Sequence, residues 1–344
     1  MKPITKSFRL LTTLFVFATC MNASGQTTKL IDHLEMQVRG DYQREYVGSE
    51  AVKTGSGFKG KYFNVLLSGK ITPNLSWSLR QRLNRFSKAS DFFDATDWIY
   101  LDYRPTKNWS FAAGKQEVYV GGYEYDRAPI NIFFASEYWH NISPFQWGAS
   151  VSYLPGTASR DKFTLQVTQS PFRTYEPEED MYSYSLLWAG NHGVWETLWS
   201  TNLLEYAPGK FIHYISLGNA LNLGRFHIEL DFMNRAVNRQ TYLLRDCSVV
   251  GEIAFKASDM VNVFAKASYD VNKTNRAGDL SVLPGTELTR IGGGIEVFPL
   301  KKKDVRLHAN YSYTWGTQTN PEGTLQNKQS IIDVGVTWNL PFIR

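Results

Sequence analysis

The chain has 344 residues, of which 43% are hydrophobic, 15% aromatic and 20% charged, and its formal net charge is +5. So many aromatic residues exclude a disordered chain, and the longest apolar runs are too short for a helical membrane span. Lys2, Lys6 and Arg9 lie in a stretch without acids, which leaves 5 − 3 = +2 for the rest, too little for a typical nucleic-acid-binding protein.

Residues 1–25 have the pattern of a cleaved export signal. The positive start is followed by an apolar core at Leu10–Cys20 and by the small residues Ala23, Ser24 and Gly25. This order predicts cleavage before Gln26 and a mature chain of residues 26–344.

Two alternatives for this segment fit less well. An N-terminal membrane anchor would need a longer apolar run. A lipoprotein would be acylated at Cys20, but Phe17 and Thr19 are poor neighbours for that modification. After cleavage, Cys247 is the sole cysteine of the mature chain, so we expect no intramolecular disulfide.

The mature chain alternates apolar and polar residues with a period of two. In the first run, Leu34, Met36 and Val38 alternate with polar neighbours, which is typical of a strand with one apolar and one wet face. We predict sixteen strands, approximately at 33–44, 58–71, 75–84, 95–104, 109–117, 145–154, 163–169, 181–190, 194–204, 210–221, 225–235, 245–256, 260–271, 287–298, 305–315 and 330–340.

The predicted connections alternate strictly in length. The short connections are 72–74, 105–108, 155–162, 191–193, 222–224, 257–259 and 299–304. The longer connections are 45–57, 85–94, 118–144, 170–180, 205–209, 236–244, 272–286 and 316–329. Every proline after Pro3 lies in a connection, at a strand edge or past the last strand. Together these features predict an all-β fold, a transmembrane antiparallel barrel with periplasmic termini.

Residues 118–144, which follow the fifth strand, form the longest connection. They contain a set of apolar residues that a loop facing water would not need: Ile130, Ile132, Phe133, Phe134, Tyr138 and Trp139. We predict that this loop folds into the lumen and narrows it, with Glu124, Asp126 and Arg127 facing Arg39, Arg80 or Arg82. The alternative is an external flap that packs on neighbouring loops or on a trimer partner.

The inward faces of the strands carry charges of both signs. The candidate pore-lining bases are Arg39, Lys70, Arg80, Arg82, Arg290 and Arg306, and acids are equally frequent on these faces. We find no catalytic motif and no His or Cys pair at the spacing of a metal site, and therefore predict no catalytic residue, metal or cofactor. Mixed charge predicts at most a weak anion preference.

Several motifs resemble the phosphate-selective porin O and P family of Bacteroidetes-type outer membranes. They are Asp94–Pro105, Trp109–Gln116, Gly121–Tyr125 and Trp338–Phe342. The resemblance implies a 16-stranded, trimeric channel for small solutes. It does not carry phosphate specificity, since bases do not outnumber acids on the wet faces.

The expected protein is a porin of a Gram-negative outer membrane. It would contact outer-membrane lipid, pass small hydrophilic solutes or anions by passive diffusion, bind no nucleic acid and form a homotrimer. The alternatives are a barrel subunit of a secretion or surface-assembly complex and, less favoured, an outer-membrane hydrolase with inward groups such as Asp231 with Arg225.

Overall fold

The computed structural model describes residues 29–85, 91–156, 160–175, 179–237 and 243–343. The predicted export signal therefore lies outside the described residues. Sixteen long strands make up the fold: β1 (His33–Val47), β3 (Gly57–Thr72), β4 (Leu75–Arg82), β5 (Thr96–Tyr103), β6 (Trp109–Glu117), β7 (Phe145–Tyr153), β8 (Lys162–Gln169), β9 (Tyr182–His192), β10 (Trp195–Ala207), β11 (Lys210–Leu223), β12 (Phe226–Val237), β13 (Asp246–Lys256), β14 (Val261–Asn272), β15 (Glu287–Val297), β16 (Val305–Thr317) and β17 (Gln329–Ile343).

The remaining elements are short and lie in the connections. They are β2 (Glu50–Ala51), which pairs antiparallel with the end of β1, the helices α2 (Tyr123–Asp126) and α3 (Glu137–Asn141), and the 3₁₀ turns η2 (Leu83–Arg85), η3 (Pro129–Asn131) and η4 (Arg173–Tyr175). Among the described residues, no helix has the length and apolar character needed to cross a membrane.

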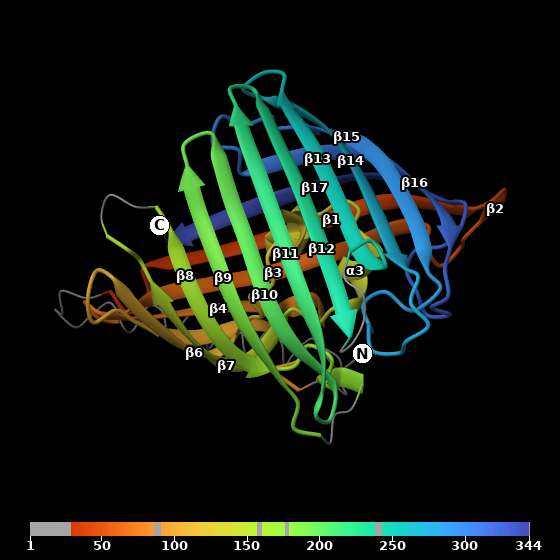
Figure 1. The fold of residues 1–344 in the computed structure, drawn as a ribbon. Coiled ribbons are helices and arrows are strands. Elements are labelled where there is room, and N and C mark those ends of the chain that lie inside the picture. Colours follow the sequence, from red (N-terminus) through yellow and green to blue (C-terminus); the bar gives the residue numbers. More distant parts are fainter. Residues whose placement is uncertain (1–28, 86–90, 157–159, 176–178, 238–242, 344) are drawn as a thin grey trace.

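The strands form one closed antiparallel barrel (Figure 1). Each long strand pairs with its neighbour in the chain, and β1 closes the barrel on β17 from Leu34 opposite Ile343 to Val47 opposite Gln329. Closure satisfies the backbone groups that an open edge would expose to lipid. The prediction of a 16-stranded antiparallel barrel is confirmed.

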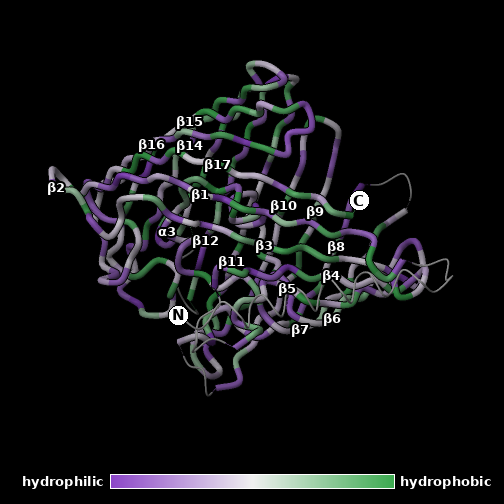
Figure 2. Tube along the Cα trace, turned by 180° about the vertical axis from the view of Figure 1, so that it is seen from behind, coloured by the Kyte–Doolittle hydropathy of each residue, from purple (hydrophilic) through white to green (hydrophobic). Residues whose placement is uncertain are grey.

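The two faces of the barrel wall are apolar outside and polar inside. Along β8, Phe163, Leu165 and Val167 are exposed on the outer surface, whereas Thr164 and Gln166 are buried inside. Figure 2 shows the same alternation as purple and green segments along most strands. A soluble barrel would reverse this arrangement, because its outer surface would face water.

The side-chain directions predicted from the alternation agree with the structure. Arg80, Arg82 and His308 are buried on the inner side, while Leu307 and Tyr311 are 44% and 49% exposed on the outer side. A slip of one residue would have inverted all of them.

Three details of the prediction were wrong. The connection expected at 205–209 is a two-residue turn, because β10 continues to Ala207 and β11 begins at Lys210. β4 ends at Arg82, so Leu83 lies in η2. Pro341, expected past the last strand, lies inside β17, where a register shift at Leu34 and Glu35 accommodates the missing N–H.

Candidate functional site

Residues 118–144, here called the inner loop, lie against the inner wall of the barrel. Gly121 donates its backbone N–H to Ser200 Oγ at 2.8 Å and accepts from Ser216 Oγ at 2.6 Å, while Asn202 donates to the Tyr119 carbonyl at 2.8 Å. A Cβ on Gly121 would lie 2.4 Å from the Leu198 carbonyl oxygen, so only glycine allows this approach. The inner loop thus enters the barrel along β10 and β11.

Two wall carboxylates hold the first turns of the two short helices. Asp231 on β12 accepts the backbone N–H groups of Tyr123 and Glu124, both at 2.8 Å. Asp270 on β14 accepts the N–H groups of Glu137 at 2.9 Å and of Tyr138 at 3.4 Å. These contacts satisfy amides that a helix leaves unpaired at its start.

Wall cations bind the carbonyl groups at the tip of the inner loop. Arg39 donates to the carbonyls of Ile132 at 2.8 Å and Ile130 at 3.2 Å. Arg290 donates to the Ala135 carbonyl at 3.0 Å, and Lys266 to the Phe134 carbonyl at 3.1 Å. Arg306 also donates to the Ile130 carbonyl, at 3.3 Å. The tip is therefore fixed by cations from β1, β14, β15 and β16.

Glu124 and Arg127 contact other wall residues than the sequence analysis predicted. Glu124 is 5% exposed, pairs with Lys266 at 2.7 Å and accepts from Ser136. Arg127 donates to both carboxylate oxygens of Glu252 at 2.8 Å and also binds Glu229. Asp126 is exposed.

The predicted partners on the opposite wall have different contacts. Arg80 and Arg82 both donate their Nε to Asp97 at 2.6 Å, so the two arginines share one carboxylate of the neighbouring strand β5. The β4–β5 pairing shifts its register between Arg80 and Gln81. Strict alternation along β4 does not predict this shift. Lys70 is exposed near the β3–β4 turn.

A buried charged cluster lies beneath the tip of the inner loop. His308 Nε2 is 3.2 Å from Asp41 Oδ1 and 3.1 Å from Asp333 Oδ1, and these three ligand atoms lie within 4.8 Å of one another. Arg39 also binds Asp41, at 2.8 Å, and thereby supplies the counter-charge. The Phe133 ring covers the cluster, with its centroid 4.6 Å from the His308 ring and 4.9 Å from the Arg39 guanidinium.

Sequence spacing did not reveal this cluster, because its members lie on three strands that meet only where the barrel closes. The register shows their proximity: His308 pairs with Gly335, which also pairs with Asp41, and a Cβ at Gly335 would lie 2.3 Å from Asp41 Oδ1. Glycine therefore permits the approach of the two side chains.

Of the apolar loop residues that the prediction named, Ile130, Ile132, Phe134 and Tyr138 are buried, and Phe133 and Trp139 are partly buried. Val118, Val120, Tyr125, Tyr138 and Ile142 pack into one cluster with wall and loop residues. The wall and loop members of the cluster are Phe172, Leu204, Ile212, Tyr214, Met233 and Val282. An apolar core inside the barrel thus supports one side of the inner loop.

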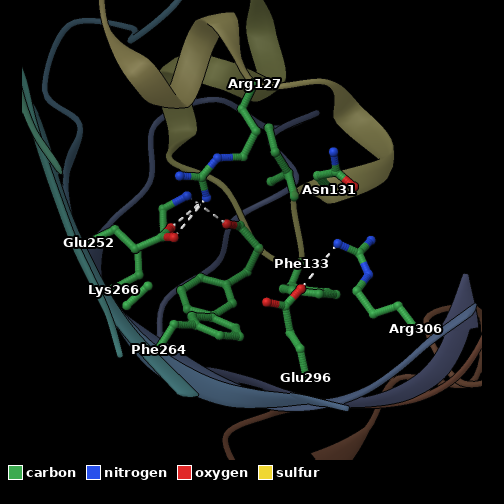
Figure 3. Close-up of a pocket in the computed structure, with 11 residues that line it drawn as sticks. Arg127, Asn131, Phe133, Glu252, Phe264, Lys266, Glu296 and Arg306 are labelled. Atoms are coloured by element: carbon green, nitrogen blue, oxygen red, sulfur yellow. Dashed lines mark hydrogen bonds and ion pairs between the residues drawn. The ribbon is translucent and has the colours of Figure 1, made fainter. Parts of the chain in front are cut away.

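A cavity of about 240 Å³ lies between the inner loop and strands β13–β16 (Figure 3). Arg127, Glu252 and Lys266 are on one side of it, and Arg306 and Glu296 are on the other. Arg306 and Glu296 form an ion pair at 3.1 Å.

The ion pair of Glu124 predicts a pH-dependent inner loop. Burial alone raises the pKa of Glu124, but Lys266 and the hydrogen bonds from Ser136 outweigh burial and hold it below the usual 4.5. The pair therefore stabilises the inner loop above about pH 4.5, and this contribution is lost as the pH falls through the lowered pKa. We expect channel noise to increase as the pH is lowered below about 4.5, measured as the variance of the open-channel current.

Two variants check the origin of this effect. Glu124→Gln should be noisy already at neutral pH and change little on acidification. Asp259→Asn, which removes an exposed carboxylate in the β13–β14 turn, should keep the wild-type profile. Equal noise in wild type and Glu124→Gln at every pH would contradict the assignment.

A closed 16-stranded barrel with an apolar exterior, a charged interior and an inward loop has the architecture of an outer-membrane porin. The family model of phosphate-selective porin O and P matches residues 33–208, so the chain belongs to that family. It is an outer-membrane porin channel.

Solved structures agree on the fold. The anion-selective porin from Comamonas acidovorans is 10% identical, with coverage of 89% of this chain and 98% of that chain and a TM-score of 0.65. OmpT, an outer-membrane protein of Vibrio cholerae, is 14% identical, with coverage of 92% and 99% and a TM-score of 0.61. OmpF of Salmonella typhi, in complex with daunomycin, is 10% identical, with coverage of 89% and 97% and a TM-score of 0.54. Among curated proteins, none matches significantly.

Proposed function

We propose that the barrel passes small hydrophilic solutes and ions by passive diffusion, with the inner loop setting its narrowest bore. The observation that carries this proposal is the attachment of the inner loop to inward-facing side chains of β1, β10–β12 and β14–β16. Sixteen strands leave an aqueous interior, so a loop held against the inner wall reduces an existing channel.

The channel should have at most a weak anion preference. Among the candidate pore-lining bases, Arg39 and Arg306 each pair with a carboxylate, and Arg80 and Arg82 share the carboxylate of Asp97. Arg290 binds a loop carbonyl. Paired charges contribute little net potential, and salt screens the remaining potential within about 8 Å at physiological ionic strength.

We expect a reversal potential near zero in asymmetric KCl, with anion and cation permeabilities of similar size. A large anion-directed reversal potential would contradict the proposed charge balance.

We infer that the barrel carries out no chemistry of its own. Asp231, considered above as a member of a hydrolytic set, binds the backbone of α2, and the nearby Glu229 binds the side chain of Arg127. These carboxylates position the inner loop. A secretion or assembly subunit remains the other function considered, and it predicts that the purified protein alone conducts no ions.

We propose export with cleavage before Gln26 and assembly as a homotrimer. The trimer is supported by the fold shared with OmpT of Vibrio cholerae, one structure of which is described as a trimer form. Mass spectrometry of protein extracted from outer membranes tests both points. The expected result is three copies of an unacylated chain that starts at Gln26. An acylated Cys20 would contradict the cleavage site, and a monomer mass in mild detergent would contradict the trimer.

A further inference from the structure

Among the described residues that line the cavity beside the inner loop, every cation has a carboxylate partner. Its cations bind carboxylates: Arg127 to Glu252 and Glu229, Lys266 to Glu124, and Arg306 to Glu296. Three cations thus meet four carboxylates. A phosphate group would have to displace a carboxylate and would face the repulsion of the others, so the site disfavours it.

The same groups suit a ligand with hydroxyl groups. A hydroxyl both donates and accepts hydrogen bonds, so it can bridge carboxylate oxygens and guanidinium N–H groups without disturbing their ion pairs. Among the described residues, the buried Nε of Arg306 finds no hydrogen-bond partner. Arg306 lines the cavity and carries this unsatisfied N–H on the same guanidinium that pairs with Glu296.

Aromatic rings form an apolar surface between the charged groups. Phe133 of the inner loop and Phe264 of β14 lie with ring centroids 5.3 Å apart and planes 18° from parallel. Both rings are half-buried, and Figure 3 shows Phe264 on the same side as Glu252 and Lys266. Such a surface packs against the C–H face of a saturated ring, while the polar edge of that ring meets the charges.

The volume limits the ligand to a single ring. Sites for drug-sized ligands usually measure about 300–1,000 Å³, and this cavity measures about 240 Å³. We propose that it binds a neutral, hydroxyl-rich ring of the size of one sugar unit, in preference to phosphate. This inference rests on the proposed diffusion channel. It names the class of solute that the channel binds during passage.

Ion current through single channels, measured with added glucose, tests the proposal. Glucose should reduce the current to a saturating level, because bound sugar obstructs the narrow region. Glycerol serves as the small open-chain control and should lower the current only in proportion to the conductivity of the solution. Inorganic phosphate at constant ionic strength should also produce no saturating decrease.

Two variants connect the effect to the cavity. Phe264→Ala removes the apolar surface and Glu252→Gln weakens one polar edge, and each should raise the half-saturating glucose concentration by roughly tenfold, equivalent to ~1.4 kcal/mol. Phe111→Ala, a matched change on the exposed outer face of β6, should leave it unchanged. Glu252→Gln still tests the site if Phe264→Ala fails to fold.

The outcomes separate the two claims. A wild-type protein that conducts no ions would contradict the proposed function. A conducting protein without saturable block by glucose, or with block unaffected in both cavity variants, would contradict the sugar site. Saturable block by phosphate alone would overturn the inference in favour of an oxyanion site.

Discussion

Replacing residues 124–139 with a short glycine–serine linker is expected to raise the single-channel conductance several-fold. The exchange removes most of both short helices and the tip that Arg39, Lys266 and Arg290 hold against the inner wall. Conductance rises with the cross-section of the narrowest region, so a loop inside the barrel must have a large effect.

A deletion elsewhere controls for general disturbance of the loops. Removal of residues 321–323, which lie in the β16–β17 connection, should leave the conductance close to that of wild type. If the exchange at 124–139 also leaves it unchanged, the inner loop does not set the bore.

The second large effect is expected for Arg235→Ala, measured as loss of barrel stability. Arg235 is fully buried, and its Nε lies 3.0 Å from Asp246 and 2.6 Å from Asp279. Asp279 belongs to the β14–β15 connection, so this cluster ties that connection to the wall. Removal of the guanidinium leaves two buried carboxylates without their counter-charge, which costs about 3–5 kcal/mol.

The matched control is Arg104→Ala. The Arg104 side chain is 70% exposed and pairs with Asp102, so its loss should cost less than about 1 kcal/mol. Both variants are compared by the temperature at which the folded barrel converts to the unfolded band on gel electrophoresis. Equal midpoints for the two variants would show that the Arg235 cluster does not support the barrel.

The alternation of residues predicted the strands because a membrane barrel exposes every second side chain to lipid. In β8, for example, Leu165 and Val167 could only face outward once Thr164 and Gln166 faced the lumen. The same pattern predicted which arginines point inward. Strand ends were harder to predict, since residues such as Glu205, Tyr206 and Ala207 are compatible with either a strand or a loop.

The partners of the inward charges were not predictable in the same way. Alternation gives the face of a residue but not the segment that packs against it, and Glu137 is 133 residues from Asp270. The acids on the wall therefore resembled free pore charges, although Asp231 and Asp270 bind helix amides. The pair Gly121–Gly122 was a usable signal, because adjacent glycines at a loop entry mark a close backbone approach.

The most direct test of the account is a planar-bilayer recording of the purified wild-type protein. The central claim is that the barrel is a water-filled channel narrowed by the inner loop. It predicts discrete current steps of uniform size with the protein alone, and larger steps when residues 124–139 are exchanged. Silence of the wild-type protein, with conduction only after a partner is added, would contradict it.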